Sequence, residues 1–323
     1  MADFVMMIGL PGSGKTYKAK ELLKDEYAGA VYLSSDETRE KLFGDSRDQT
    51  HNAELFDYLH KHIKYALDNK QNVIFDATNI SSKRRRAFLE ELKRYNCRKI
   101  AYFMLTGYDV CLSNNDTRGN TVPDEVIKKM YLNFEIPMMY EGWDEIRVVP
   151  DSDSFLSVYD LLYQRDNGLC YIFQDNPNHD LTIGDHCVKS SFYCAEIFRR
   201  IDDVFNYDEG YTSPNPESIV KAALLHDIGK GFTKSFVNSK GEETDVAHYY
   251  NHQNVSAYMA YQCLYGHPDV DYVCELILYH MIPFFIDTDK AKEKYTRLLG
   301  EQAMRDIYIL HEADVSAKKG IQI

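Results

Sequence analysis

The stretch GLPGSGKT occupies residues 9–16 and decides the fold of the first half of the chain. It matches the pattern G-x-x-x-x-G-K-[ST], whose glycines let successive backbone N–H groups turn toward phosphate oxygens. The apolar run at residues 4–8 predicts a buried strand before it, and residues 17–24 predict an amphipathic helix after it. A strand, a glycine-rich loop and a helix in this order favour a nucleotide-binding loop over a glycine-rich turn without a ligand.

Each part of this loop has a predicted role toward a nucleoside triphosphate. Lys15 is expected to reach the β- and γ-phosphates, and the hydroxyl of Thr16 is expected to bind Mg²⁺. The predicted cofactor of this half is therefore ATP, or another nucleoside triphosphate, together with Mg²⁺. The residues predicted to bind it within the loop are Gly12, Ser13, Gly14, Lys15 and Thr16.

The length and composition of the chain limit the classes of protein to which it can belong. Its 323 residues suffice for about two domains. No stretch reaches the roughly 18 consecutive apolar residues of a membrane span, so no membrane partner is expected. Seven cysteines without a C-x-x-C pair predict a reducing, cytoplasmic environment in place of a disulfide framework.

The net charge of −13 is unevenly distributed along the chain. Residues 1–150 carry 22 Lys and Arg against 23 Asp and Glu, a net of −1, whereas residues 151–323 carry 15 against 27, a net of −12. The acidity of the second half favours a metal site there over a nucleic-acid surface. In the first half, the basic run at residues 83–86 is interpreted either as a solvated helix face or as a patch that contacts phosphates.

Apolar runs alternate with helical patterns through the first 150 residues. This alternation predicts a parallel sheet with helices on both faces, an α/β fold. After the polar residues 150–154 nearly every segment predicts a helix, so the chain is expected to divide into an α/β domain at 1–152 and an all-α domain at 153–323. The predicted strands are 4–8, 31–34, 72–76, 99–105 and 145–149, and the predicted helices are 17–24, 51–69, 83–95, 123–134, 155–165, 186–204, 215–229, 247–266, 269–280, 288–298 and 300–318, with a loop or small hairpin at 231–247.

Charged residues follow the predicted strands at the edge where a parallel sheet binds its ligand. Asp36 follows the second strand and is expected to accept a proton from an acceptor hydroxyl, although it also fits the N-cap of a helix. Arg39, one helical turn on, is expected to hold a phosphate of the acceptor. Asp76 ends the third strand and is expected to position Mg²⁺ or to orient Lys15 and Arg39, unless it is only a turn residue. Arg118 is interpreted as a lid residue over the donor phosphates or as an ordinary surface arginine.

These residues make the first half of the chain resemble the polynucleotide 5′-kinase family. The shared motifs are GLPGSGKT, the D-x-x-R of Asp36 and Arg39, the D-x-T-N of residues 76–79 and the lid segment that contains Arg118. The resemblance implies that this is a P-loop kinase domain in which the D-x-x-R aspartate is the general base on a 5′-hydroxyl. The family often has a second lid arginine one turn earlier, where this chain has Asn114, which leaves fewer contacts to the donor.

A second group of candidate residues lies in the acidic half. An apolar helix is expected to deliver the adjacent pair His226 and Asp227, which opens toward a pocket because neighbouring helical residues are about 100° apart. Imidazoles and carboxylates together suit Mn²⁺, Fe²⁺, Co²⁺, Ni²⁺ or Mg²⁺ better than a structural zinc. Any one of these histidines, taken alone, is better interpreted as a core or surface residue than as a metal ligand. The prediction of a metal site therefore depends on the whole set. The candidate metal ligands are His186, His226, Asp227, His252, His280 and Asp314.

This set resembles the HD phosphohydrolase superfamily over residues 160–318. The signature H…HD…D falls on the first three and the last of these ligands, and members that bind two metals add two histidines where His252 and His280 stand. The resemblance implies phosphomonoester or phosphodiester hydrolysis, with Asp227 bridging two divalent ions whose charge makes a bound water a usable nucleophile. Lys230 is interpreted as a contact to the substrate phosphate or as a solvated helix end.

Together, the two halves resemble the end-healing enzymes that fuse a polynucleotide kinase to an HD domain. The hypothesis is a bifunctional enzyme for broken RNA or DNA. It phosphorylates a 5′-hydroxyl end and removes a 2′,3′-cyclic, 2′- or 3′-phosphate from the other end, before a separate ligase joins them. Two alternatives stay open. One is a nucleoside or other small-molecule kinase fused to a nucleotide phosphohydrolase, and the other is a regulatory protein that senses a nucleotide without hydrolysing it.

Overall fold

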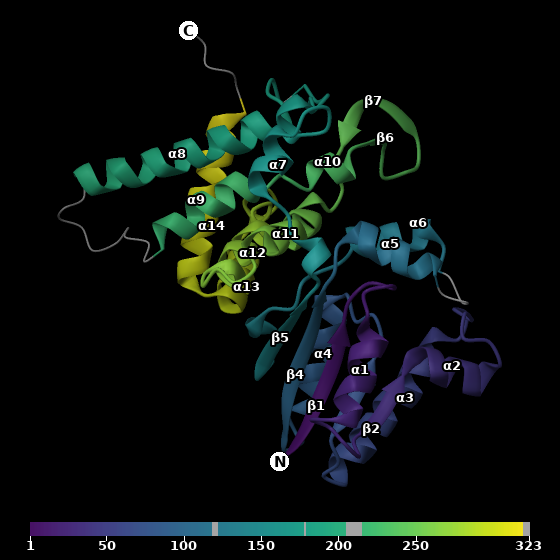
Figure 1. Cartoon of the computed structure of the whole chain (residues 1–323). Helices are drawn as coiled ribbons and strands as arrows, with labels where there is room; N and C mark the ends of the chain where they lie inside the picture. Colours follow the sequence, from purple (N-terminus) through teal and green to yellow (C-terminus); the bar gives the residue numbers. More distant parts are fainter. Residues whose placement is uncertain (118–121, 178, 205–214, 319–323) are drawn as a thin grey trace. The chain divides into compact units, whose positions relative to one another are not determined.

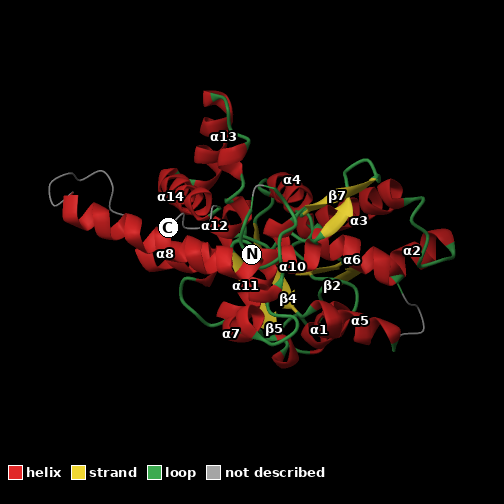
Figure 2. Ribbon diagram, turned by 90° about the horizontal axis from the view of Figure 1, so that it is seen from above, coloured by secondary structure: helices red, strands yellow, loops and turns green. Residues whose placement is uncertain are grey.

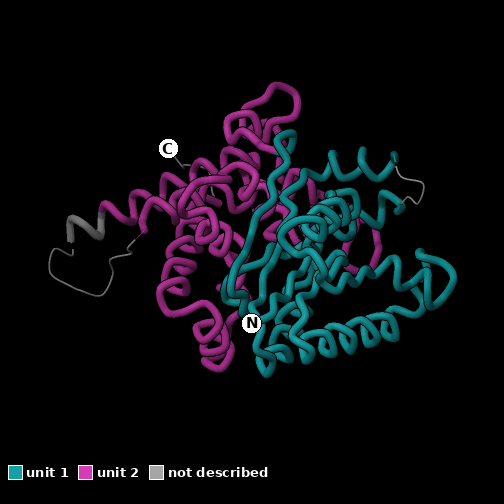
Figure 3. The backbone as a smooth tube through the Cα atoms, turned by 60° about the horizontal axis from the view of Figure 1, so that its bottom comes forward, with its two compact units in different colours: residues 1–154 teal, residues 155–323 magenta. Residues whose placement is uncertain are grey.

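The structure is a computed structural model in which the chain divides into two units, Met1–Ser154 and Phe155–Ile323 (Figure 3). Each unit has its own secondary structure and its own buried apolar residues. None of the described helices is both long and apolar enough to cross a membrane. The described residues are all those of the chain except 118–121, 178, 205–214 and 319–323.

A five-stranded parallel sheet forms the centre of the first unit (Figure 1). Its strands are β1 (Ala2–Ile8), β2 (Val31–Ser34), β3 (Val73–Asp76), β4 (Cys97–Leu105) and β5 (Glu145–Pro150). They lie in the order β2-β3-β1-β4-β5, and all neighbours are parallel. The register pairs Asp76 with Met7 on one side and with Ser34 on the other. The carboxyl ends of β1, β2 and β3 therefore meet at one edge of the sheet.

Helices cover both faces of this sheet. They are α1 (Lys15–Lys24), α2 (Ser35–Phe43), α3 (Asn52–Asp68), α4 (Ser82–Leu92), α5 (Tyr108–Asp116) and α6 (Asp124–Leu132), with 3₁₀ turns at η1 (Met139–Glu141) and η2 (Ser152–Ser154). Alternate residues of a strand face opposite sides. Val5 and Met7 pack with Leu22 of α1, whereas Met6 and Phe75 lie on the other side, between α3 and α4. The predicted α/β fold, with a parallel sheet and helices on both faces, is confirmed.

Helix α2 is absent from the predicted elements because residues 35–43 are mostly polar and carry no apolar stripe. Its start is fixed instead by a cap, in which the side chain of Ser34 accepts a hydrogen bond from the backbone N–H of Glu37 at 3.3 Å. Asp36 therefore lies in the first turn of α2, and its interpretation as the N-cap is wrong. A carboxylate in the first turn also complements the positive end of the helix dipole.

The basic run at residues 83–86 contains one buried arginine. Nε and Nη2 of Arg85 donate to the two carboxylate oxygens of Glu141 at 2.7 and 2.5 Å, and Nε1 of Trp143 donates to the same carboxylate at 3.0 Å. The side chains of Arg85 and Glu141 are 1% and 0% exposed. Neither interpretation of the run holds for Arg85, because its side chain is buried against this carboxylate. The other three members of the run are exposed.

Replacing Arg85 with methionine is expected to destabilise the first unit by about 3–5 kcal/mol, because the Glu141 carboxylate stays buried without its partner. Urea titration gives the free energy of unfolding. Arg86→Met, at an exposed position of the same helix, is the control and should change that free energy by no more than about 0.5 kcal/mol. Equally small effects of the two substitutions would contradict a structural role for the buried pair.

Helices form almost all of the second unit (Figure 2), which confirms its predicted all-α class. The predicted helix 215–229 ends at Leu225, however, and the predicted helix 247–266 begins only at His252. Of the loop or small hairpin predicted at 231–247, the hairpin is present: Ser235–Val237 pairs antiparallel with Glu243–His248, whose last residue lies inside the predicted helix. The elements are α7 (Val158–Tyr163), η3 (Leu169–Tyr171), α8 (Ile183–Val204), α9 (Pro216–Leu225), α10 (Lys230–Thr233), β6 (Ser235–Val237), β7 (Glu243–His248), α11 (His252–Leu264), α12 (Val270–Tyr279), η4 (Ile282–Phe284), α13 (Asp289–Leu299) and α14 (Glu301–Ala317).

Candidate active sites

The glycine-rich loop joins β1 to α1, and two of its glycines have backbone conformations that other residues rarely adopt. Gly12 has φ +83° and Gly14 has φ +84°, in the left-handed region. A Cβ atom on Gly12 would also lie 2.0 Å from the carbonyl oxygen of Cys111 in α5. The glycines therefore let the loop turn tightly beside α5 and directly ahead of the N-terminus of α1, where backbone N–H groups bind anions.

The side chains that follow the loop lie at the carboxyl edge of the sheet. Nζ of Lys15 donates a hydrogen bond to the carbonyl oxygen of Leu10 at 2.6 Å. Oγ1 of Thr16 donates to Oδ2 of Asp76 at 2.7 Å, and the hydroxyl of Tyr32 donates to the same oxygen at 2.8 Å. A hydroxyl beside a buried carboxylate suits Mg²⁺, because hard cations take oxygen ligands. Of the roles predicted for Asp76, this geometry supports the positioning of Mg²⁺.

Asp36 and Arg39 are close together at the start of α2 but differ in exposure. Nη1 of Arg39 is 3.1 Å from Oδ1 of Asp36, and the side chains are 6% and 75% exposed, respectively. The guanidinium also donates to the carbonyl oxygen of Ser46 at 3.2 Å and to Oδ1 of Asn52 at 3.1 Å, while its Nε is buried without a hydrogen-bond partner in the described structure. These partners, rather than Asp76, hold Arg39 in place. Asp36 is accessible to a substrate hydroxyl.

The predicted lid segment begins at the end of α5. Nδ2 of Asn114, which stands where the kinase family often has arginine, donates to the carbonyl oxygen of Gly12 at 3.0 Å. The buried side-chain amide of Asn115 exchanges two hydrogen bonds with the backbone of Val122, at 2.8 and 3.0 Å. No sequence motif indicates this clamp across the base of the segment. Arg118 itself lies outside the described residues.

Six buried side chains converge in the second unit, carried by helices that pack on one another. His186 lies in α8, His226 and Asp227 directly follow α9, His252 begins α11, His280 directly follows α12, and Asp314 lies in α14. They form two groups of potential metal ligands, in each of which the ligand atoms lie within 4.8 Å of one another: His186, His226, Asp227 and Asp314 in one, and Asp227, His252 and His280 in the other. We call these six residues the cage; Asp227 belongs to both groups.

Backbone contacts orient three imidazoles of the cage. Nδ1 of His226, His252 and His280 each lies 2.7–2.8 Å from the carbonyl oxygen three residues earlier. A proton on Nδ1 leaves a lone pair on Nε2, which is the arrangement that metal-binding histidines use. Nε2 of His186 and of His226 and Oδ1 of Asp227 are buried and make no hydrogen bond with a described residue. The donor set therefore fits a divalent cation.

Burial and neighbouring charges shift the pKa values of the cage residues in opposite directions. Burial disfavours the charged imidazole of His226, but the carboxylates of Asp227 and Asp314 outweigh burial and raise its pKa to about 10. Burial also disfavours the ionised form of Asp227, but His226 and Lys230 outweigh it and hold the pKa of Asp227 well below its usual range. Burial and the charge of His226 lower the pKa of His280 to about 3. The carboxylates of Asp227 and Asp314 therefore favour positive charge beside them, as a metal site requires, whereas His280 stays a neutral imidazole.

Lys230, the first residue of α10, lies against the cage. Its Nζ is 2.6 Å from Oδ2 of Asp227, donates to Oε1 of Gln174 at 3.1 Å, and lies 5.4 Å from the centre of the Tyr249 ring. Lys230 is buried, so its interpretation as a solvated helix end is wrong. Gln174 and Tyr249 are also held together, because the Tyr249 hydroxyl donates to the backbone carbonyl of Gln174. No spacing in the sequence indicates either of these two residues.

Two family models match the chain. The model of the AAA domain matches residues 4–137, and the model of the HD domain matches residues 183–317. The first match contains the glycine-rich loop with Asp36, Arg39 and Asp76, and the second contains the whole cage.

Individual proteins are similar to parts of the chain. L-seryl-tRNA(Sec) kinase of Methanococcus maripaludis is 25% identical over 249 residues, which are 75% of this chain and 92% of that protein. A chain of the Pnkp1/Rnl/Hen1 RNA repair complex is 23% identical over 41% of this chain and 43% of its own length, with a TM-score of 0.37. A gluconokinase from Sinorhizobium meliloti 1021 is 13% identical over 46% of this chain and 83% of its own length, with a TM-score of 0.34. This chain spans less than half of the repair-complex chain that it matches.

The two family models agree with the two structural units. The match to the AAA domain lies in the unit with the parallel sheet and the phosphate-binding loop, and the match to the HD domain lies in the helical unit with the His-Asp cage. This chain is therefore a P-loop kinase domain of the AAA type fused to an HD domain.

Proposed function

We propose that this chain heals the ends of broken nucleic acid, in particular RNA. The kinase domain phosphorylates 5′-hydroxyl ends, and the HD domain removes a 2′,3′-cyclic, 2′- or 3′-phosphate from the opposing end. The observation that supports the proposal is that one chain contains, in one unit, Asp36 and Arg39 at the carboxyl edge of a sheet with a phosphate-binding loop and, in the other unit, a buried group of potential metal ligands around Asp227. A broken strand with a 5′-hydroxyl and a 3′-terminal phosphate needs both reactions before a separate ligase can join it.

The proposed kinase reaction transfers one phosphoryl group. The carboxylate of Asp36 accepts the proton of the 5′-hydroxyl. The hydroxyl oxygen then bonds to the γ-phosphorus of ATP while the bond from that phosphorus to the β-phosphate oxygen breaks, which gives ADP and a 5′-phosphate. Lys15 and Thr16 hold the donor phosphates and Mg²⁺, and Arg39 holds a phosphate of the acceptor. Arg118 is proposed to contact the donor from the lid segment.

The proposed hydrolase reaction takes place at the cage. Its cofactors would be divalent transition metals, two ions of Mn²⁺, Co²⁺, Ni²⁺ or Fe²⁺, which when bound would lower the pKa of a water. The oxygen of that water bonds to phosphorus while the bond from phosphorus to a ribose oxygen breaks, and the ribose oxygen takes up a proton. A 2′,3′-cyclic phosphate needs two such hydrolyses, of which the first opens the ring and the second releases phosphate. Asp227 belongs to both ligand groups and is suited to hold the two ions together. Lys230 lies beside Asp227 and is suited to contact a phosphate oxygen and to stabilise the negative charge that develops on it.

A second candidate function follows from the similarity to L-seryl-tRNA(Sec) kinase, which spans 75% of this chain. In this alternative the acceptor is the hydroxyl of a small molecule, a nucleoside or an aminoacylated tRNA, and the HD domain hydrolyses a nucleotide. The exposed carboxylate of Asp36 would serve as the base in either case. The identity of the acceptor therefore decides between the two functions.

An oligoribonucleotide with a 5′-hydroxyl and a 2′,3′-cyclic phosphate tests both activities at once. With ATP, Mg²⁺ and Mn²⁺, we expect it to gain a 5′-phosphate and to lose the cyclic phosphate, and mass spectrometry follows both ends. Parallel reactions contain DNA of the same sequence, free nucleosides, or seryl-tRNA. If neither end of the oligonucleotide is modified, end healing is contradicted. Phosphorylation of only nucleosides or seryl-tRNA would establish the second candidate. ATP binding without any product would support a nucleotide sensor.

A further inference from the structure

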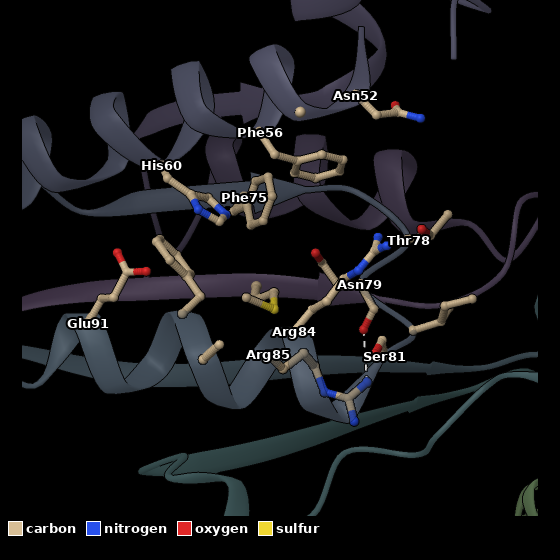
Figure 4. Close-up of a pocket in the computed structure, with 15 residues that line it drawn as sticks. Asn52, Phe56, His60, Phe75, Thr78, Asn79, Ser81, Arg84, Arg85 and Glu91 are labelled. Carbon is tan, nitrogen blue, oxygen red and sulfur yellow. Dashed lines mark hydrogen bonds between the residues drawn. The ribbon is translucent and has the colours of Figure 1, made fainter. Parts of the chain in front are cut away.

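A cavity of about 470 Å³ lies in the kinase domain between α3 and α4 (Figure 4). It is on the face of the sheet opposite to the core that α1 forms with Val5. Aromatic rings make up much of its wall: Phe56 and His60 come from α3, Phe75 from β3 and Phe88 from α4. The volume is within the range of roughly 300–1,000 Å³ that is usual for small-molecule sites.

The cavity extends to the edge of the sheet at which the acceptor residues lie. Asn52 lines it, and Oδ1 of Asn52 accepts a hydrogen bond from Nη2 of Arg39 at 3.1 Å. Thr78 also lines it, two residues after Asp76. Figure 4 shows Asn52 and Thr78 toward one end of the cavity and Glu91 at the other. A substrate whose phosphate contacts Arg39 is therefore separated from this end of the cavity by one side chain, that of Asn52.

The walls of this cavity suit a flat ring with polar edges. His60 stacks on Phe88 with ring centres 3.9 Å apart and an interplanar angle of 18°, and meets Phe75 edge-on. Burial lowers the pKa of His60, so the ring is neutral at pH 7. Arg84 and Glu91 add hydrogen-bonding groups beside the rings. A nucleobase matches this combination, because its faces stack on aromatic rings and its edges form hydrogen bonds.

We propose that this cavity binds the base of the 5′-terminal nucleotide of the acceptor, while Arg39 binds its phosphate and Asp36 its hydroxyl. This inference rests on the proposed 5′-kinase function and names the part of the substrate that the kinase domain recognises besides its backbone. Stacking depends little on base identity, so all four bases are expected to be accepted.

The test compares two 5′-hydroxyl oligonucleotides, one intact and one whose 5′-terminal residue lacks its base. With the unmodified protein, loss of the base is expected to raise KM about tenfold or more, because the stacking of that base on the aromatic wall is lost. The value of kcat should change much less, because Asp36 and the donor-binding residues are untouched. Initial rates of phosphorylation at a series of oligonucleotide concentrations give both constants.

A tryptophan introduced at the wall should replace the base. Ala87 in α4 and Ala53 in α3 both line the cavity and are exposed, so Ala87→Trp or Ala53→Trp can fill it without displacing a core residue. Either variant is expected to raise KM for the intact oligonucleotide to the value for the abasic one. Ala28→Trp, at an exposed position that does not line the cavity, is the matched control and should keep the preference for the intact end.

The outcomes separate this inference from the proposed function. Equal KM values of the unmodified protein for intact and abasic ends would overturn the base site while leaving the 5′-kinase function in place. A failure to phosphorylate either oligonucleotide would contradict the 5′-kinase function itself. If both cavity variants bind ATP normally and still prefer the intact end, the base binds elsewhere.

Discussion

Asp227→Asn is expected to abolish hydrolysis of the 3′-terminal phosphate and to leave 5′ phosphorylation unchanged. Oδ2 of Asp227 is 3.3 Å from Nε2 of both His186 and His226, and its Oδ1 is 3.2 Å from Nε2 of His252. Asparagine has nearly the same shape but no charge, so it cannot hold two cations together. The loss should exceed the roughly 10–100-fold that follows removal of a residue that only supports a metal ligand, because Asp227 is itself the proposed shared ligand.

Metal content provides a readout of Asp227→Asn that does not depend on activity. The variant is expected to retain fewer Mn²⁺ ions per molecule after dialysis than the unmodified protein, as measured by inductively coupled plasma mass spectrometry. Asp306→Asn is the matched control: Asp306 is also buried, but it accepts hydrogen bonds from Tyr272 and Gln302 outside the cage. Full metal binding and hydrolysis by Asp227→Asn would contradict the proposed site. Loss of both in a folded Asp306→Asn would show that the effect is not specific to the cage.

An element of the fold can be predicted from the sequence where its own residues show an apolar pattern that indicates burial. Residues 4–8 of the strand β1 are a run of buried apolar residues, which is typical of strands covered on both faces. The glycine-rich loop after this run identifies the domain. The helix α2 cannot be predicted in this way, because its polar residues lack an apolar stripe and its start depends on the Ser34 cap. The helical pattern predicts the start of α11 five residues too early, at 247, because β7 extends to His248 and Asn251 has a left-handed conformation directly before His252.

The candidate sites are harder to predict from the sequence than the fold is, because they depend on contacts between distant segments. The H…HD…D signature and the two additional histidines identify all six cage residues, and the resemblance implies that Asp227 is shared. The fold brings these residues together and places Asp227 in both ligand groups. Besides Asp227, Lys230 contacts Gln174 and Tyr249, and neither of these residues belongs to a motif. The same is true of Arg85 and the buried carboxylate of Glu141. The catalytic roles of the kinase and cage residues stay predictions, and the substitutions at Asp227 and Asp36 test them.

Asp36→Asn is expected to slow the phosphorylation of 5′-hydroxyl ends at saturating substrate by about 10²–10⁴-fold, which is the range that a positioned general base contributes. The asparagine can still accept a hydrogen bond from Arg39 through its oxygen, but it cannot take the proton of the hydroxyl. Because the Asp36 side chain is 75% exposed, the loss of its charge at the start of α2 and beside Arg39 should lower the free energy of unfolding by no more than about 1 kcal/mol. KM for ATP should also be unchanged, because Lys15 and Thr16 are the residues proposed to bind the donor.

The neighbouring substitution Glu37→Gln separates proton transfer from simple charge. It removes the same charge from the exposed side of α2, where Glu37 pairs with Lys20 at 3.4 Å. If the negative charge of α2 alone mattered, both substitutions would lower kcat alike, whereas a general base predicts the loss only for Asp36→Asn. A higher KM for the oligonucleotide with an unchanged kcat would instead show that Asp36 only orients Arg39. Hydrolysis of the cyclic phosphate, measured in the same sample, should persist in both variants. Its loss together with phosphorylation would contradict two independent sites.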